Sequence, residues 1–235
     1  MKLDALFFAA HPDDAELCCG GTIAKLVKSG KKTGIVDLTR GELGTRGSVS
    51  TRKKEAGIAS KVLGLSIREN LKIPDGNIEN NHKNRLKVIS VIRKYQPAII
   101  FFPHFHDRHP DHRNTHILVK ESAFYSGLSK IHTHGYRSHR PKRNFYYMQT
   151  YTFEPSLIVD ISDTFNIKMK AIACYPSQFH NPKMKGPETF ISDKMFINYI
   201  SARSGFYGFQ IGVKYGEPFY TEEKSKIGSR GLFEI

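Results

Sequence analysis

A short apolar run at residues 3–9 constrains the fold of this chain more than any other stretch. It is almost continuous, as expected for a central strand of a parallel sheet that is covered on both faces. Residues 33–39 and 98–102 are two further runs of this kind, with helix-like stretches between them. Strands that alternate with helices predict an α/β fold with a doubly wound, mostly parallel, Rossmann-like sheet.

The rest of the chain extends this pattern toward the C-terminus. We expect further extended segments at residues 67–73, 145–150 and 157–161. We expect helices at residues 22–27, 51–63, 84–95, from about 111, 163–175 and 192–203. A tail rich in glycine and aromatic residues follows the last helix. With 235 residues and no visible linker, the chain is expected to form one domain spanning 1–235, in which the later strands and helices are a C-terminal extension.

Chemically active side chains gather where two of the expected strands end. His11, Asp13 and Asp14 directly follow the first run, and a loop with four histidines, residues 104–112, follows the run at 98–102. In parallel sheets, ligands bind where the C-terminal ends of the strands meet their loops. Both groups are therefore expected to face one crevice.

The residue types in this crevice are those of a catalytic metal site. A catalytic zinc ion takes three protein ligands, drawn from histidine nitrogen and carboxylate oxygen, and keeps one position for water. In the turn constrained by Pro12, His11 and Asp14 can point to one centre, and His112 can supply the third ligand. Asp13 is then the candidate general base, because hydrolysis requires a group that takes a proton from water.

Two further residues of the histidine-rich loop fit supporting roles. His109, held by Pro110, is placed to stabilise a developing oxyanion as an imidazolium, and Asp111 is placed to orient an imidazole. Either Asp13 or His109 can protonate a leaving amine, and the sequence does not decide between them. We expect one Zn²⁺ per chain, although a site of two histidines and one aspartate also accepts Fe²⁺ or Co²⁺.

Less specific explanations exist for each motif alone. An Asp-Asp pair often caps a helix, and a histidine-rich loop can be solvent-exposed or can scavenge metal. Their joint position at strand ends of one sheet favours an active site. A dinucleotide site is disfavoured, because Gly20-Gly21 belongs to no GxGxxG motif and the acidic turn would repel a pyrophosphate. A serine hydrolase is disfavoured by the lack of a GxSxG motif.

Charge and cysteine content bear on which partners and which cellular compartment we expect. The net charge of +14 comes from 36 Lys and Arg against 22 Asp and Glu, which raises the question of nucleic acid. The basic residues form only short, scattered clusters without a nucleic-acid-binding motif, so we expect no nucleic-acid partner and favour a small anionic substrate. Three cysteines make no disulfide framework, and no leader or long apolar run is visible. We therefore expect a cytoplasmic protein without a membrane partner.

The motifs together resemble those of the LmbE-like (PIG-L) family of zinc-dependent N-acetylglucosaminyl deacetylases. The resemblance is carried by AHPDD, CGGTIAKLV, LTRGELGTRG, TRKKEA, PDG and DRHPDHRN. YPSQF at 175–179 and YGEPF at 215–219 are more narrowly similar to bacillithiol biosynthesis deacetylases. This similarity implies removal of the acetyl group from N-acetylglucosaminyl malate. The alternatives are deacetylation of another GlcNAc conjugate, such as a chitooligosaccharide or antibiotic precursor, or a non-catalytic metal-bearing module that binds sugar or nucleic acid.

The resemblance also implies roles by position. His11, Asp14 and His112 would hold zinc, Asp13 would be the general base, and His109 would face the oxyanion. The family further implies a homo-oligomer, either a trimer or a hexamer.

Substrate contacts follow from the same resemblance. Arg52 and Asp75 would hold sugar hydroxyls, with Glu42 beside them. A dicarboxylate aglycone would suit cationic groups near the mouth of the crevice. The candidates for these groups are Arg46, Arg108 and Arg140.

Overall fold

The structure, a computed structural model, describes residues 1–133, 135–184 and 186–224, so residues 225–235 of the expected domain lie outside the described residues. Five parallel strands form the first part of its sheet, in the order β3-β2-β1-β4-β5. These strands are β1 (Ala5–Ala9), β2 (Thr33–Asp37), β3 (Ile67–Asn70), β4 (Ile99–Pro103) and β5 (Arg143–Tyr147). The expected doubly wound α/β fold is confirmed. The strand order reverses between β1 and β4, which is where such sheets open a binding crevice.

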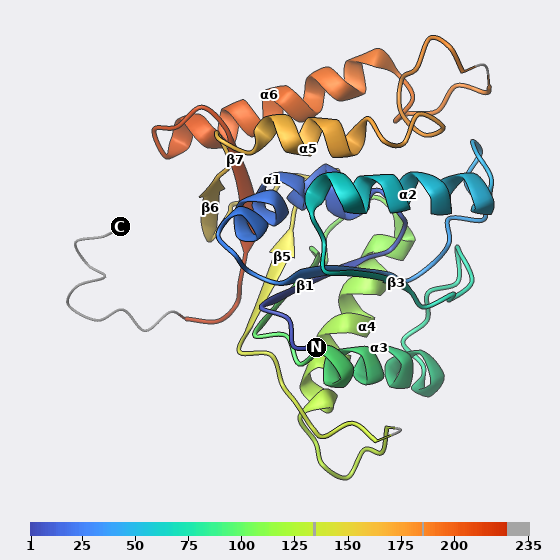
Figure 1. The fold of residues 1–235 in the computed structure, drawn as a ribbon, viewed down its shortest axis with the longest axis vertical. Helices are drawn as coiled ribbons and strands as arrows, with labels where there is room; N and C mark the ends of the chain where they lie inside the picture. Colours follow the sequence, from blue (N-terminus) through green and yellow to red (C-terminus); the bar gives the residue numbers. More distant parts are fainter. Residues whose placement is uncertain (134, 185, 225–235) are drawn as a thin grey trace.

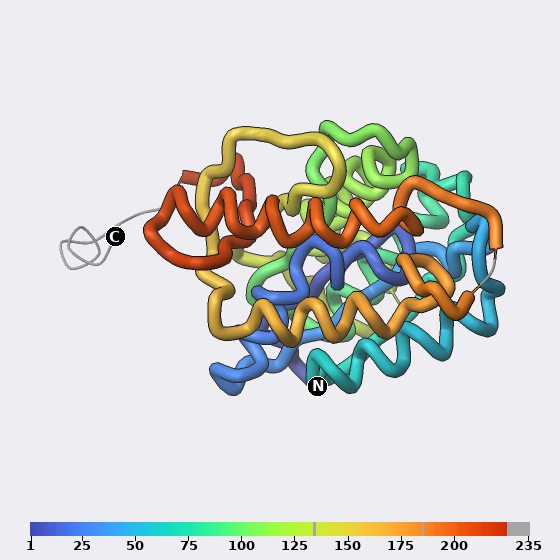
Figure 2. The backbone as a smooth tube through the Cα atoms, turned by 90° about the horizontal axis from the view of Figure 1, so that it is seen from above, coloured from blue at the N-terminus to red at the C-terminus, as the bar shows by residue number. Residues whose placement is uncertain are grey.

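Helices cover both faces of this sheet (Figure 1). One face carries α1 (Asp14–Lys28), α2 (Val49–Leu63), α5 (Phe165–Ile172) and α6 (Lys194–Gln210), and the other carries α3 (His82–Tyr95) and α4 (Pro110–Ser126). Seen from above, α6, α1, α5 and α2 follow one another across their face (Figure 2).

Two apolar cores lie above and below the sheet. Successive side chains of a strand point to opposite faces, so Phe7 joins the core under α1 while Phe8 joins the core over α3 and α4. Every residue of β1 is fully buried. This double coverage explains why β1 reads as an unbroken apolar run rather than an alternating one.

The C-terminal extension adds two strands with a different direction. β6 (Leu157–Asp160) forms the edge of the sheet, and β7 (Gly216–Tyr220) lies between β5 and β6, antiparallel to both. The sequence indicates only a glycine- and aromatic-rich tail here. Gly216, Glu217 and Pro218 argue against a central strand by local preference, and only the long-range pairing of β7 reveals it.

The last helix is longer than expected, because α6 continues to Gln210 instead of ending near residue 203. Gly208 is not a helix terminator here. A Cβ atom on it would lie 2.6 Å from the backbone nitrogen of Tyr215, so glycine at this position allows the following segment to pass close to the helix.

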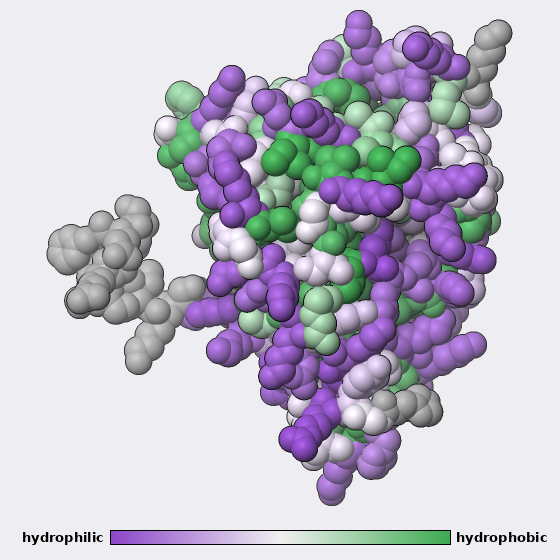
Figure 3. All heavy atoms as spheres, in the orientation of Figure 1, coloured by the Kyte–Doolittle hydropathy of each residue, from purple (hydrophilic) through white to green (hydrophobic). Residues whose placement is uncertain are grey.

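Most of the face shown in Figure 3 is hydrophilic, with apolar side chains gathered mainly in its upper half. Among the described residues, the helices are too short or too polar to cross a bilayer.

Candidate metal centre and active site

The turn between β1 and α1 fixes the first half of the site. The backbone N–H of His11 donates to Asp14 Oδ2 at 2.9 Å, and the His11 ring contacts the same oxygen, so the two side chains lie on the same side of the turn. Asp13 stands between them with a φ of 129°, a conformation that non-glycine residues rarely adopt. Such strain often occurs at functional sites, where the surrounding structure enforces it.

His11, Asp14 and His112 converge into one buried group, each with a potential ligand atom within 4.8 Å of the others. His11 Nδ1 lies 3.5 Å from Asp14 Oδ2, and His112 Nε2 lies 3.4 Å from Asp14 Oδ1. Ligands about 2.0–2.2 Å from a tetrahedral zinc ion are separated from one another by about 3.3–3.6 Å. The geometry and the donor set therefore fit a divalent metal ion.

The outer nitrogens of both imidazoles contact carboxylates. His112 Nδ1 lies 2.7 Å from Asp107 Oδ1, while His11 Nε2 lies 3.0 Å from Asp75 Oδ1 and 3.3 Å from Asp111 Oδ2. A carboxylate acceptor keeps the proton on the outer nitrogen and leaves the inner nitrogen free to bind metal. Asp111, expected to orient an imidazole, thus contacts that of His11, and Asp75 contacts the same nitrogen.

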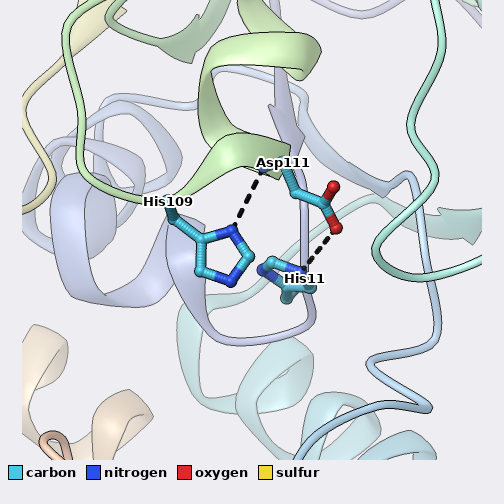
Figure 4. A group of neighbouring side chains, drawn as sticks. All are labelled: His11, His109 and Asp111. Carbon is cyan, nitrogen blue, oxygen red and sulfur yellow. Dashed lines mark hydrogen bonds and ion pairs between the residues drawn. The ribbon is translucent and has the colours of Figure 1, made fainter.

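A second group, formed by His11, His109 and Asp111, is shown in Figure 4. In this group the Asp111 carboxylate faces His11, and His109 Nδ1 accepts the backbone N–H of Asp111 at 3.2 Å. A metal here would need the outer nitrogen of His11, which two carboxylates already contact. The group containing Asp14 and His112 is therefore the better metal site.

His109 lies beside this centre, with its ring centroid 4.9 Å from that of His11. It caps α4 through Nδ1, which leaves Nε2 as the nitrogen that can carry a proton toward the pocket. Burial, together with the nearby His112 and His11, lowers the pKa of His109. These features favour a neutral imidazole that donates through Nε2 over the imidazolium expected from the sequence.

Asp13 lies next to the metal group but faces Arg52, whose Nη2 donates to Asp13 Oδ2 at 2.9 Å. Burial raises the pKa of Asp13 to about 7, against the opposing effect of the Arg52 cation. A carboxyl group with a pKa near neutrality suits a general base. Arg52 also donates to the carbonyl oxygen of Pro12 at 2.6 Å, and its expected contact with sugar hydroxyls stays a prediction.

A pocket of about 620 Å³ opens over this group, and Arg46, Arg108 and Arg203 are among the residues that line it. Arg46 donates from Nε to the carbonyl oxygen of Ser177 at 3.0 Å, and the Arg108 guanidinium lies 4.6 Å from the centre of the Phe190 ring. The pocket therefore combines cationic and aromatic walls. Asp75 also lines the pocket, although its oxygens contact His11, Leu43 and Gly76.

Two expected substrate contacts do not lie in the pocket. Glu42 is not among the lining residues, and it contacts Arg40 and the backbone N–H of Asp75. Arg140 packs over the ring of Phe124 and donates to its carbonyl oxygen at 2.9 Å. Phe124 is at the C-terminal end of α4, whereas the site is at the N-terminal end, so Arg140 lies away from the pocket of its own chain. Its contact with the substrate stays a prediction.

Three residues of the site were missed in the sequence. Asp107 was detectable, because it lies in the histidine-rich motif five positions before His112. Gln149 follows β5, and Arg203 lies in the middle of α6. Neither of these two belongs to a local motif. The pairing of β5 with β4 brings Gln149 to the pocket, and the packing of α6 brings Arg203 there.

Comparisons with known proteins relate this chain to a family of de-N-acetylases. The family model PIG-L, described as GlcNAc-PI de-N-acetylase, matches residues 6–123. The diacetylchitobiose deacetylase of Thermococcus kodakarensis is 30% identical over 221 residues, which are 88% of this chain and 78% of that protein. A conserved protein of Thermus thermophilus superposes with a TM-score of 0.88 at 36% identity and covers 97% of this chain and 98% of its own. The N,N'-diacetylchitobiose deacetylase of Pyrococcus horikoshii, in complex with an inhibitor, gives a TM-score of 0.80 at 30% identity over 98% of this chain and 85% of its own.

Proposed function

Because the chain belongs to the PIG-L family of de-N-acetylases, we propose that it is a zinc-dependent hydrolase that removes the acetyl group from N-acetylglucosaminyl malate in bacillithiol biosynthesis. The broader activity, deacetylation of a GlcNAc-type conjugate with the help of a metal, follows from its relatives and from the His-Asp-His group. The observation that carries the hydrolase proposal is the buried carboxylate of Asp13, which Arg52 fixes next to that metal group in the lining of a pocket.

The chain's own residues divide the chemistry between them. His11, Asp14 and His112 would hold the metal, which would polarise the acetyl carbonyl and make water acidic enough to lose a proton near neutral pH. Asp13 takes that proton, and Arg52 fixes the direction of its carboxylate.

The remaining steps concern the developing charge and the leaving group. His109 presents Nε2 toward the acetyl oxygen, where negative charge develops as the carbon becomes tetrahedral. Asp13 then donates the proton it took from water to the leaving nitrogen, because a neutral His109 would become an imidazolate if it gave up its Nε2 proton. The products are acetate and a free amine.

The walls of the pocket support an anionic aglycone. Arg46 and Arg108 line the pocket beyond the metal group, and guanidinium groups bind carboxylates with paired, charge-assisted hydrogen bonds. A neutral disaccharide would offer these cations no carboxylate. The competing proposal, a chitooligosaccharide substrate, is supported by the 30% identity with two diacetylchitobiose deacetylases.

A comparison of kcat/KM for amine release from N-acetylglucosaminyl malate, N,N'-diacetylchitobiose and free GlcNAc tests the proposal. Contacts with charged groups contribute about 1.5–3 kcal/mol, so the malate conjugate should exceed both neutral substrates by about 10-fold or more. Asp13→Asn tests the role of the base separately from the choice of substrate. It should lower kcat by about 10²–10⁴ while leaving the bound metal in place.

Two results would contradict the proposal. A higher kcat/KM for diacetylchitobiose would identify the enzyme as a chitooligosaccharide deacetylase. Near wild-type turnover by Asp13→Asn would show that Asp13 is not the base.

A further inference from the structure

Gln149 is a polar residue at the floor of the pocket that has no role in the reaction described above. It lies two residues beyond β5, and β5 runs parallel to β4, so it stands at the same edge of the sheet as the histidine-rich loop. Its Nε2 atom lies 3.2 Å from His112 Nε2, the nitrogen that faces Asp14. Gln149 therefore borders the metal group from a third strand end.

The backbone around Gln149 is tied to the same elements that hold His112. Its carbonyl oxygen accepts a hydrogen bond from Arg203 Nη1, and the next residue, Thr150, donates its N–H to Asp107 Oδ2 at 2.8 Å. The other oxygen of Asp107 contacts His112 Nδ1. The position of Gln149 relative to His112 is thus set by a shared carboxylate.

In the contact between Gln149 and His112, the donor and the acceptor can be assigned. Because Asp107 keeps the His112 proton on Nδ1, His112 Nε2 offers only a lone pair, and the Gln149 amide must donate to it. That lone pair is also the one that a metal ion would use. A metal held by His112 would take this lone pair, so the Gln149 amide would turn away from His112 and its N–H would be free for another acceptor in the pocket.

The other end of the amide is also unsatisfied. Among the described residues, Gln149 Oε1 is buried and has no hydrogen-bond partner. Buried polar atoms without a partner are rare and costly, which indicates that Oε1 is placed to accept a hydrogen bond from a ligand rather than to stabilise the fold.

We propose that Gln149 donates its side-chain N–H to the acetyl oxygen as the carbonyl carbon becomes tetrahedral, as a second donor beside His109. The proposal rests on the deacetylase function proposed above. A donor aimed at developing charge contributes more in the transition state than to the bound substrate, so its effect falls on kcat rather than on KM.

Gln149→Leu removes the amide with little change in size, and Gln210→Leu, at the exposed end of α6, is the control. We expect Gln149→Leu to lower kcat by about 10²-fold, the effect of losing one such donor, with little change in KM. A methylphosphonamidate of glucosamine, which mimics the tetrahedral state, should bind the zinc-loaded variant more weakly by a similar factor. The zinc dissociation constant, measured by competition with a chelator, should match that of wild type.

The outcomes separate the proposal from its alternatives. Weaker zinc binding in Gln149→Leu would show that the amide oxygen is a metal ligand, and unchanged kcat and phosphonamidate affinity would show that the amide has no catalytic role. Either result would overturn the proposal. Failure of the wild-type protein to release amine would instead contradict the proposed function, whereas the phosphonamidate and zinc titrations require no turnover.

Discussion

Two adjacent aspartates, Asp13 and Asp14, have different environments because the backbone at Asp13 is forced into an unusual conformation. Asp14 faces His11 and His112, whereas Asp13 faces Arg52. A relaxed helix start would not separate the two carboxylates in this way. The φ of 129° at Asp13 is therefore part of how the site assigns them different functions.

This conformation predicts an inverted order of stability for two variants. Asp13→Ala and Asp13→Gly both remove the carboxylate, but alanine retains the Cβ that makes a positive φ unfavourable. We expect Asp13→Gly to be more stable than Asp13→Ala by about 1 kcal/mol or more in urea unfolding at equal zinc concentration. At ordinary helix or strand positions glycine is the less stable of the two, so an advantage for alanine would show that the turn is not strained.

The sequence predicted the metal group but not all of its surroundings. His11, Asp14 and His112 were found because each lies in a compact motif next to a strand. The missed residues Gln149 and Arg203 lie in segments whose positions depend on the packing of α6 and β5. The structure places Arg140 at the end of α4 that is far from the site, and no local pattern in the sequence indicates that direction.

At the scale of elements, α4 links the site to the core. It begins at Pro110 with His109 as its cap, and it presents His112 in its first turn. One turn later, His116 is buried between Phe102 and Tyr146, and its Nδ1 contacts the carbonyl oxygen of Pro103 at 2.9 Å. His116 thus follows His112 at helical spacing, but its side chain packs in the core instead of facing the metal group.

His116 predicts a loss of stability in mild acid. Burial lowers the pKa of His116 from 6.5 to about 4, against the opposing effect of the hydrogen bond with the Pro103 carbonyl. Because the folded-state pKa is depressed, the neutral ring is favourable above pH 6.5, and this stability is lost as the pH falls toward 4. Linkage gives a loss of about 2 kcal/mol between pH 7.5 and pH 5.

The control variant for this prediction is His116→Gln, which keeps a donor for Pro103 but cannot titrate. Urea unfolding of both proteins at pH 7.5 and pH 5 should show a smaller pH effect in the variant. Equal pH effects in the two proteins would mean that His116 does not contribute to acid sensitivity.

The strands β1, β2 and β4 were predictable because they are apolar runs, but the start of α1 was not: this helix begins at Asp14 instead of near residue 22. β7 was not predictable, because it buries the charged side chain of Glu217, whose stabilising partners lie far away in the sequence. Glu217 accepts the backbone N–H groups of Gly21 and Thr22, and Lys168 donates to it at 2.6 Å. A charge in an apolar strand is evidence against the strand until its partners are known.

At the scale of the whole molecule, this buried pair joins the two halves of the chain. The family match covers residues 6–123, which supply the metal group, while the rest of the chain supplies other pocket residues, including Gln149 after β5 and Arg203 in α6. Lys168 in α5 and Glu217 in β7, each with a side chain about 1% exposed, connect that extension to α1. The pocket therefore depends on an interface that no single motif encodes.

Lys168→Met tests this interface, because it leaves the Glu217 carboxylate buried without its cation. Removal of one partner from a buried ion pair costs about 3–5 kcal/mol, so we expect a loss of that size in urea unfolding. Lys28→Met is the matched control, since Lys28 forms an exposed ion pair with Asp163 between α1 and the start of α5. Exposed pairs contribute little, so the control should leave stability almost unchanged. If the two variants lost equal stability, the buried pair could not be the contact that fixes the extension, and apolar packing between α1 and α5 would have to position Gln149 and Arg203.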